Sequence, residues 1–360
     1  MFGQRLRLAR KKAGLSMRAL ADCVSPRVSA QAISKYEAGK MMPSSAVLVG
    51  LGKALGVSLD FLMGGQVEEL KEIEFRKHSG TSAQDRAKAE ALVTEKLEDY
   101  LAIEDILELA PPDDPFGDLV TERVESFEAV DGIACELRRE WALGMDPVPS
   151  MAGLLEDKGI KVIEADLPER FDGLACDVKR GGDSPDTEVV VVSSRTSIER
   201  KRFNLAHELA HRVIRATGNP EIGLEKAMNR FAGAFLVPAV HLAGEAGAHR
   251  HGMTYHELMR LKRLYGVSAA AMLMRLGQVG ILSQAAIKYA FRSYARVWRT
   301  EEPEPIRDDE GFGAFERPQR FERLVWRALG EQIISPVRAA QLLRLPLATI
   351  EREIRGPRGQ

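Results

Sequence analysis

A short segment in the second half of the chain, RFNLAHELAHRVI, contains two histidines and a glutamate at metal-binding spacing. His207 and His211 are four residues apart, so on a helix both imidazoles lie on one face and can bind the same Zn²⁺ ion. Glu208 follows the first histidine, where its carboxylate can act as general base towards a zinc-bound water. Coordination lowers the pKa of such a water to about 7, which allows attack on a carbonyl group near neutral pH. The spacing therefore predicts a hydrolytic zinc site.

A catalytic zinc needs a third protein ligand and leaves one position open. The residues after His211 lack the glycine and histidine with which metzincins continue, so a carboxylate from a following helix is expected instead. Glu225 is the best candidate because it begins the amphipathic segment LEKAMNRFAGAFLVP, in which Asn229 shares its face. Glu221 is the alternative ligand. The other histidines of this region are expected on the surface or in loops: His241, His249, His251 and His256.

The N-terminal segment has the pattern of a DNA-binding helix-turn-helix domain. About five short helices fit residues 1–63, and Ser16 and Ser29 stand at expected N-caps. The second helix of such a motif lies in the major groove and presents polar side chains to the bases. We expect Gln31 to read adenine and Ser34 and Lys35 to lie on the same face. The flanking cations are expected to hold phosphates: Arg18, Arg27 and Lys40.

Charge is distributed very unevenly along a chain whose formal net charge is only −1. Residues 1–63 carry ten basic and three acidic side chains, a net of +7, whereas residues 66–130 carry 7 basic and 18 acidic ones, a net of −11. We call the basic segment 1–63 the head; its net positive charge is typical of a domain that binds nucleic acid. The acidic stretch from Val67 to Leu109 is predicted to be a helical connector that ends at PPDDP. It is expected either to hold the head away from the rest of the chain or to compete with DNA for it. If it competes, neutralising its acidic residues between Glu90 and Glu108 should tighten DNA binding.

An α+β stretch follows the connector. Three strands are predicted at 159–166, 171–178 and 188–194, and helices at about 122–141, 197–216, 221–236, 254–264 and 268–278. The last 40 residues predict a small helical unit with Ser335 as N-cap ahead of Pro336, either a second helix-turn-helix or a docking module. The fold class is therefore mainly α with an α+β core. The predicted domains are a helix-turn-helix domain (1–65), a connector (66–120), an α+β domain that carries the histidine pair (121–282) and a C-terminal unit (283–360).

The amino-acid composition indicates the class of protein, its location and the state of its cysteines. With 45% hydrophobic and 29% charged residues, the chain resembles an ordinary globular protein. It has no apolar run of membrane-spanning length and no signal-like start, so a cytoplasmic location without a membrane partner is expected. The three cysteines, Cys23, Cys135 and Cys176, are widely spaced and are expected to be buried structural thiols.

Two stretches resemble known families. S-x-Q-A-I-S-K-Y-E-x-G at 29–39 is similar to the Cro/C1-type (XRE) repressor domains over about residues 2–63, although the turn at 24–28 is about two residues longer than usual. The segments R-F-N-L-A-H-E-L-A-H, E-x-x-x-N-R-F-A-x-x-F-L-V-P and L-M-R-L-K-R-L-Y-G-V-S resemble the ImmA/IrrE family of zinc peptidase-like proteins. That resemblance implies a zincin-like fold with His207, His211 and Glu225 as ligands and Glu208 as catalytic base.

The resemblance also implies a regulatory function. Members of the ImmA/IrrE family are associated with cutting a partner repressor and thereby inducing genes, in mobile-element control and stress responses. The leading hypothesis is a regulator that binds double-stranded DNA and, as a zinc metalloprotease, cleaves a repressor or antitoxin, with Tyr255 or His256 as a candidate oxyanion stabiliser. The alternative is a transcription factor whose zincin domain senses a ligand or metal and cuts nothing. A third possibility is an antitoxin-type repressor of its own operon. A homodimer is a candidate assembly, because two heads match two half-sites.

Overall fold

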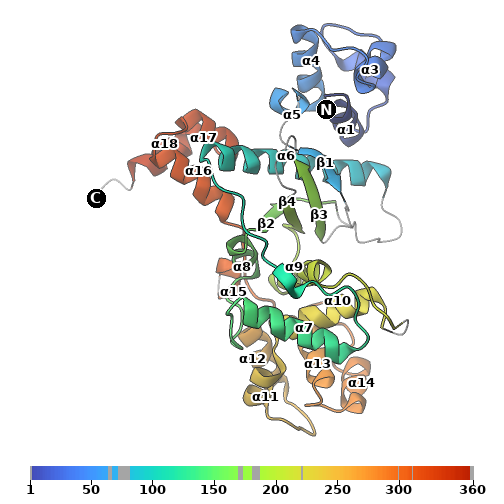
Figure 1. Ribbon diagram of the computed structural model, residues 1–360, viewed down its shortest axis with the longest axis vertical. Helices are drawn as coiled ribbons and strands as arrows, with labels where there is room; N and C mark the ends of the chain where they lie inside the picture. Colours follow the sequence, from blue (N-terminus) through green and yellow to red (C-terminus); the bar gives the residue numbers. More distant parts are fainter. Residues whose placement is uncertain are drawn as a thin grey trace. The chain divides into compact units, whose positions relative to one another are not determined.

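The computed structural model describes residues 2–63, 67–71, 82–168, 173–180, 187–219, 222–298, 300–309 and 311–356 (Figure 1). Helices predominate and one four-stranded sheet is present in this part of the chain, so the predicted mainly α fold with an α+β core is confirmed. In chain order the elements are α1 (Phe2–Lys12), α2 (Met17–Cys23), α3 (Ala30–Glu37), α4 (Ser45–Leu55), α5 (Leu59–Met63), β1 (Val67–Lys71), α6 (Ala83–Ile106), η1 (Gly117–Leu119), α7 (Phe127–Glu140), α8 (Met151–Asp157), β2 (Lys161–Ala165), β3 (Gly173–Arg180), β4 (Thr187–Ser193), α9 (Ile198–Val213), α10 (Leu224–Leu236), α11 (Ala239–Ala246), α12 (Tyr255–Tyr265), α13 (Ala269–Gln278), α14 (Gln284–Arg292), α15 (Phe312–Phe315), α16 (Arg320–Gly330), α17 (Pro336–Leu343) and α18 (Leu347–Arg355).

The chain divides into two compact units that are not continuous in sequence. Unit 1 comprises Met1–Pro111, Ile163–Val191 and Gln319–Gln360, and unit 2 comprises Pro112–Val162 and Val192–Pro318. The sequence predicts four consecutive domains. The two units group segments that are distant in sequence and so do not correspond to those domains one by one, and the four domains stay a prediction.

In unit 1 the five N-terminal helices enclose a core of their own. Ser16 and Ser29 cap α2 and α3, accepting hydrogen bonds from the backbone of Ala19 and Ala32 at 3.0 and 3.1 Å, as the sequence predicts. Leu6, Leu20, Ile33 and Leu51 are fully buried in this core. A Cβ on Gly3 would lie 2.5 Å from the carbonyl oxygen of Glu37, so glycine lets α1 pack directly against the end of α3. That contact fixes the helix expected to read DNA.

The sheet of unit 1 has the strand order β1-β3-β4-β2. β1 pairs antiparallel with β3, with Leu70 opposite Val178. The sequence pattern over Val67–Lys71 predicts a helix, and this prediction is wrong. Five residues cannot show a helical period clearly, and pairing with β3 decides the conformation.

α6 is packed on several sides, unlike the free connector that its acidic composition suggests. Val93, Leu97 and Leu101 pack with sheet residues, while Ala91 reaches the core of the N-terminal helices. Tyr100 and its neighbour Ile103 contact α16, whose helix lies against one end of α6 (Figure 1). A helix that is covered on several sides has apolar residues all round instead of one stripe.

Several carboxylates of α6 form ion pairs inside unit 1. Glu98 binds Arg5 of α1, and Glu104 binds Arg320 of α16. Glu95 is shared: one oxygen lies 3.6 Å from Lys12 Nζ and the other 3.1 Å from an Arg344 guanidinium nitrogen, beyond α17. These groups therefore tie the N-terminal helices and the C-terminal helices to α6. Two of these pairs, Glu98–Arg5 and Glu95–Lys12, are with cations of the head. Whether the acidic helix competes with DNA for the head stays a prediction.

The C-terminal helices α16, α17 and α18 form a small apolar core around Val325, Ala328 and Ile350. Ser335 caps α17 by accepting a hydrogen bond from Arg338 N at 3.2 Å, and Pro336 occupies the first turn, as expected. Whether this unit acts as a second helix-turn-helix or as a docking module stays an open prediction.

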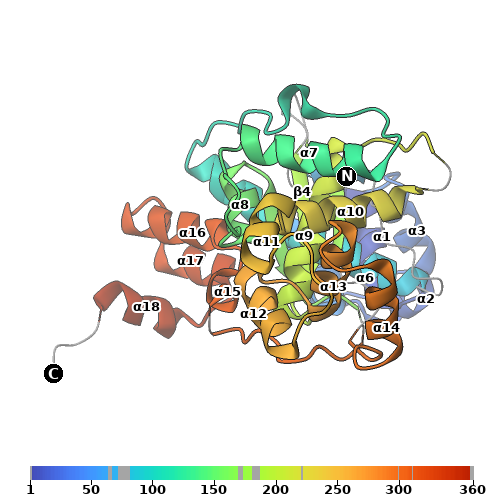
Figure 2. The ribbon, with the colours of Figure 1, turned by 90° about the horizontal axis from the view of Figure 1, so that it is seen from below.

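Unit 2 is built around α9 and α10, and α7 lies alongside α10 (Figure 2). Two fully buried ion pairs anchor α9 within the unit: Glu199 binds Lys262 at 2.6 Å, and Arg202 binds Glu316. Glu316 also accepts hydrogen bonds from the backbone nitrogens of Met151 and Ala152, at 3.0 and 2.7 Å. The first half of α9 is therefore bound both by residues that follow it in sequence, Lys262 and Glu316, and, through Glu316, by the segment at Met151 that precedes it.

The cysteines only partly match the expectation. Cys176 of β3 is buried, but Cys23 and Cys135 are exposed, so the prediction of buried thiols is wrong for these two. Each lies on a helix surface, where a small residue is tolerated without packing. No helix of the described chain is both long and apolar enough to cross a bilayer.

Candidate functional site

The metal-binding spacing of the sequence lies on α9. Ser197 caps this helix, accepting from Arg200 N at 3.4 Å, and Glu199 in the first turn suits the positive end of the helix dipole. His207 and His211 follow one turn apart near the C-terminal end. Their side chains are 1% and 12% exposed, so both imidazoles are largely removed from water.

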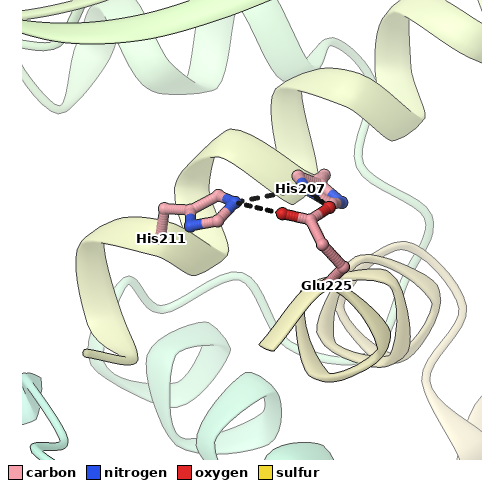
Figure 3. Close-up of side chains that lie close together, drawn as sticks. All are labelled: His207, His211 and Glu225. Carbon is pink, nitrogen blue, oxygen red and sulfur yellow. Dashed lines mark hydrogen bonds and ion pairs between the residues drawn. The ribbon is translucent and has the colours of Figure 1, made fainter. Parts of the chain in front are cut away.

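Glu225 is brought to the same place by α10. Ala227, Phe231 and Phe235 of this helix are fully buried, and the two phenyl rings stack at 5.7 Å. This apolar stripe fixes α10 against α9 and leaves Glu225 in its first turn, with a side chain that is 67% exposed. Figure 3 shows the carboxylate directed between the two imidazole rings.

The three side chains converge at distances suited to one metal ion. The Nε2 atoms of His207 and His211 are 3.2 Å apart. The carboxylate oxygens of Glu225 lie 3.5 Å from His207 Nε2 and 4.0 Å from His211 Nε2. Tetrahedral zinc with bonds of about 2.0–2.1 Å separates its ligand atoms by roughly 3.3 Å. One ligand atom from each of the three residues lies within 4.8 Å of the other two, so two imidazoles and a carboxylate could hold one such ion.

Asn229 fixes the orientation of the first histidine. His207 Nδ1 lies 3.0 Å from Asn229 Oδ1, one turn after Glu225 on α10. An amide oxygen only accepts, so Nδ1 carries the hydrogen and the lone pair of Nε2 faces the other two ligands. The sequence places Asn229 on the face of Glu225 but does not identify this contact. The spacing of four residues from a candidate ligand is the signal that could have indicated it.

Replacing Asn229 with leucine is expected to weaken zinc binding about 10- to 100-fold, because the imidazole of His207 loses its orienting acceptor. Competition with a chelator of known zinc affinity measures the change. Asn229→Asp keeps an acceptor oxygen and is expected to bind zinc at least as tightly as the wild type. Equal affinity of Asn229→Leu and wild type would contradict the orienting role.

The other sequence candidates near the metal site are placed as follows. Glu208 is on α9 beside His207 and only 2% exposed; its role as general base stays a prediction. Glu221 lies outside the described residues. His241 has other partners, with Nδ1 2.7 Å from the hydroxyl of Tyr265. His249 and His251 are exposed, as expected.

Neither candidate oxyanion stabiliser is among the three side chains that converge. Tyr255, at the start of α12, is 48% exposed, and its ring lies 6.2 Å from that of Trp298. Slight burial and a hydrogen bond with Glu304 raise the pKa of its hydroxyl. His256 is exposed. Their role in catalysis stays a prediction.

The predicted DNA-reading residues lie on the solvent face of α3. Gln31, Ser34 and Lys35 are exposed, whereas Ile33 and Tyr36 face the core. The expected phosphate-binding residues are exposed as well: Arg18, Arg27 and Lys40. Arg27, in the long turn, lies 3.5 Å from Asp22 with both side chains well exposed.

Not every cation of the basic head is available to DNA. Arg10 binds both oxygens of Glu37, at 2.5 and 2.9 Å, and donates to the carbonyl oxygen of Leu15 at 2.8 Å. The hydrogen bonds to Glu37 raise the pKa of this guanidinium. Arg5, paired with Glu98, is buried too. These two residues stabilise the domain, so the net charge of the head overstates its phosphate contacts.

Comparisons with known proteins match two stretches of the chain. Residues 6–62 match the family model of helix-turn-helix domains, and residues 155–277 match that of the IrrE N-terminal-like domain. The chain is 42% identical over 65 residues to YonR, an uncharacterized HTH-type transcriptional regulator derived from the SPbeta prophage of Bacillus subtilis (strain 168). That match covers 18% of this chain and 58% of the relative.

A solved structure, a Mycobacterium tuberculosis transcriptional regulator, aligns with 49% of this chain and 52% of its own, at 19% identity and a TM-score of 0.26. The family matches support a DNA-binding regulator with a metallopeptidase-like domain. The chain thus has an N-terminal region that matches helix-turn-helix domains and a second region, carrying the histidine pair, that matches the IrrE N-terminal-like domain.

Proposed function

We propose that this protein is a cytoplasmic, DNA-binding transcriptional regulator that cleaves a partner repressor or antitoxin and thereby induces genes. The convergence of His207, His211 and Glu225, with Glu208 between the two histidines in sequence, carries the proposal. A structural zinc site is normally closed by four protein ligands, whereas three ligands with an adjacent carboxylate are typical of hydrolysis.

His207, His211 and Glu225 would hold Zn²⁺, and Asn229 orients His207. When bound, zinc supplies a Lewis acid that polarises the scissile carbonyl and makes water more acidic. The Glu208 carboxylate takes a proton from the attacking water and delivers it to the leaving amine. This division of work requires Glu208 for cleavage but not for zinc binding.

The head supplies the DNA-binding half of the function. In the proposal Gln31, Ser34 and Lys35 contact base edges in the major groove, and the exposed arginines and lysines around them hold phosphates. Two copies of the chain would place two heads on two half-sites about one helical turn apart. A homodimer is therefore part of the proposal.

The test is to incubate the zinc-loaded chain with repressors encoded beside it and to compare wild type with Glu208→Gln. We expect wild type to cut one of them and the variant to be slower by at least about 10²–10⁴-fold, since general-base catalysis contributes that much. Zinc content, measured in parallel, should be equal in the two proteins. If neither protein cuts any candidate while both bind promoter DNA, proteolysis is refuted and a ligand- or metal-sensing regulator is the better explanation.

A further inference from the structure

Unit 2 has a surface of exposed cations and aromatic rings that the proposed function does not use. It lies on α14 and the turns after it, and we call it the α14 surface: Lys288, Tyr289, Arg292, Tyr294 and Arg296. All five side chains are exposed; Tyr289 and Tyr294 are 65% and 51% accessible to solvent. Tyrosine and arginine are enriched at binding interfaces relative to the rest of a protein surface.

The charged side chains of this surface are all positive, and the first carboxylate after them in sequence is the exposed Glu301. Residues 283–298 contain three basic side chains and no aspartate or glutamate. None of the three cations forms an ion pair with another described residue. By contrast, Arg260 of α12 pairs with Glu245 at 2.6 Å, and Arg263 pairs with Glu304. An ordinary solvated face mixes both signs, as α12 does, whereas the charged side chains of the α14 surface are all basic.

Packing beneath this surface holds it in place. Ser283 caps α14 by accepting from Ala286 N at 3.2 Å, and Gln284 donates to the carbonyl oxygen of Gly277 at 2.9 Å. Ile287 is buried against α13, the helix beside α14 in Figure 1. A Cβ on Gly277 would lie 2.7 Å from Ile287, so only glycine permits this close approach.

The turns after α14 are anchored by an aromatic residue. Trp298 is 7% exposed and meets the ring of Tyr294 edge-on at 5.4 Å. On α14 itself, Lys288 and Arg292 are four residues apart and lie on one face. The cations and phenols are therefore presented from a fixed framework, which lowers the entropy lost on binding.

We propose that the α14 surface binds the phosphate backbone of duplex DNA. Its five side chains all offer hydrogen-bond donors, and lysine, arginine and tyrosine are groups that contact phosphate in protein–DNA complexes. Each cation that meets a phosphate releases a counterion, so such a surface adds affinity without reading sequence. An acidic protein segment would also meet the charge requirement. DNA is favoured because the head of the same chain brings unit 2 to a DNA duplex, and to that extent the inference rests on the proposed function.

The test measures binding of the full chain to a long fluorescent duplex of random sequence over a series of salt concentrations. The variant Lys288→Ala/Arg292→Ala/Arg296→Ala removes three cations from the α14 surface. We expect the slope of log K against log salt to become less steep by about 2.7, or 0.9 for each phosphate that the variant no longer neutralises. The matched control Arg317→Ala/Arg323→Ala/Arg352→Ala removes three exposed cations from elsewhere and should leave the slope nearly unchanged.

An unchanged slope in the first variant, or an equal change in the control, overturns the inference. So does retention of DNA binding together with lost binding to polyglutamate, which would assign the surface to an acidic protein. A Gln31→Ala/Lys35→Ala variant of the head separates this inference from the proposed function. If only the head variant weakens DNA binding, the head binds DNA as proposed and the inference about the α14 surface fails. If only the α14 variant weakens DNA binding, the inference holds and the proposed role of the head fails.

Discussion

Replacing Glu316 with alanine is expected to lower the free energy of unfolding by about 3–5 kcal/mol. The change leaves the guanidinium of Arg202 buried without its counter-charge, and both side chains are completely shielded from solvent. Burial lowers the pKa of Arg202, and Glu316 opposes that shift, so the ion pair is what keeps the buried charge tolerable. Met151 and Ala152 would also lose the acceptor for their backbone hydrogens. Urea denaturation monitored by circular dichroism measures the loss.

Two further variants give this prediction its controls. Glu301→Ala removes an exposed carboxylate from the same segment and should change stability by less than about 0.5 kcal/mol. Arg202→Met/Glu316→Leu removes both charges and should recover part of the loss, since an apolar pair often replaces a buried ion pair without large cost. A Glu316→Ala protein as stable as the wild type would show that Arg202 does not depend on this partner.

Replacing Glu225 with alanine is expected to abolish stoichiometric zinc binding. The loss should exceed the roughly 100-fold upper value for an orienting residue, because a ligand itself is removed. Wild type should gain about 2.7 kcal/mol of stability at a free zinc concentration 100 times its dissociation constant, and the variant should gain almost nothing. Metal analysis after dialysis and thermal denaturation with and without zinc provide two independent measurements.

Glu221→Ala is the discriminating partner of that variant, since Glu221 is the other carboxylate that the sequence offers as a ligand. It should keep zinc at the wild-type level. Loss of zinc from Glu221→Ala with retention in Glu225→Ala would reverse the assignment of the third ligand. Retention in both would mean that the oxygen ligand comes from elsewhere in the chain.

The convergence of the candidate metal ligands is the feature of the molecule that the sequence predicts best. A helix has a fixed period, so the spacing of His207 and His211 determines that they share a face, whatever surrounds the helix. Glu225 is also predictable, since it starts a segment whose apolar stripe requires burial. Its distance from the histidines depends on how α9 and α10 pack, which the sequence does not state. Asn229 shows the limit most clearly: its face is predictable and its hydrogen bond is not.

Unit 1 shows why domain organisation is harder to infer. The acidic pattern of α6 suggests a solvated connector, yet Glu98 and Glu104 are used to bind arginines more than 90 and 200 residues away in sequence. The sequence shows where the charged side chains are along the chain, but it does not show which of them form ion pairs with one another. Only the three-dimensional arrangement shows that Glu95 joins Lys12 to Arg344.

Because unit 1 is made of stretches that are separate in sequence, its parts are synthesised at different times and it can be completed only late in translation. The N-terminal helices and α6 leave the ribosome first, but the side of α6 around Tyr100 and Ile103 is covered by α16, which is made near the end. All of unit 2 is translated in the interval. Unit 1, which contains the head, therefore reaches its finished structure only after all of unit 2 has been made, so a chain cut short before Gln319 has the head but not its complete support.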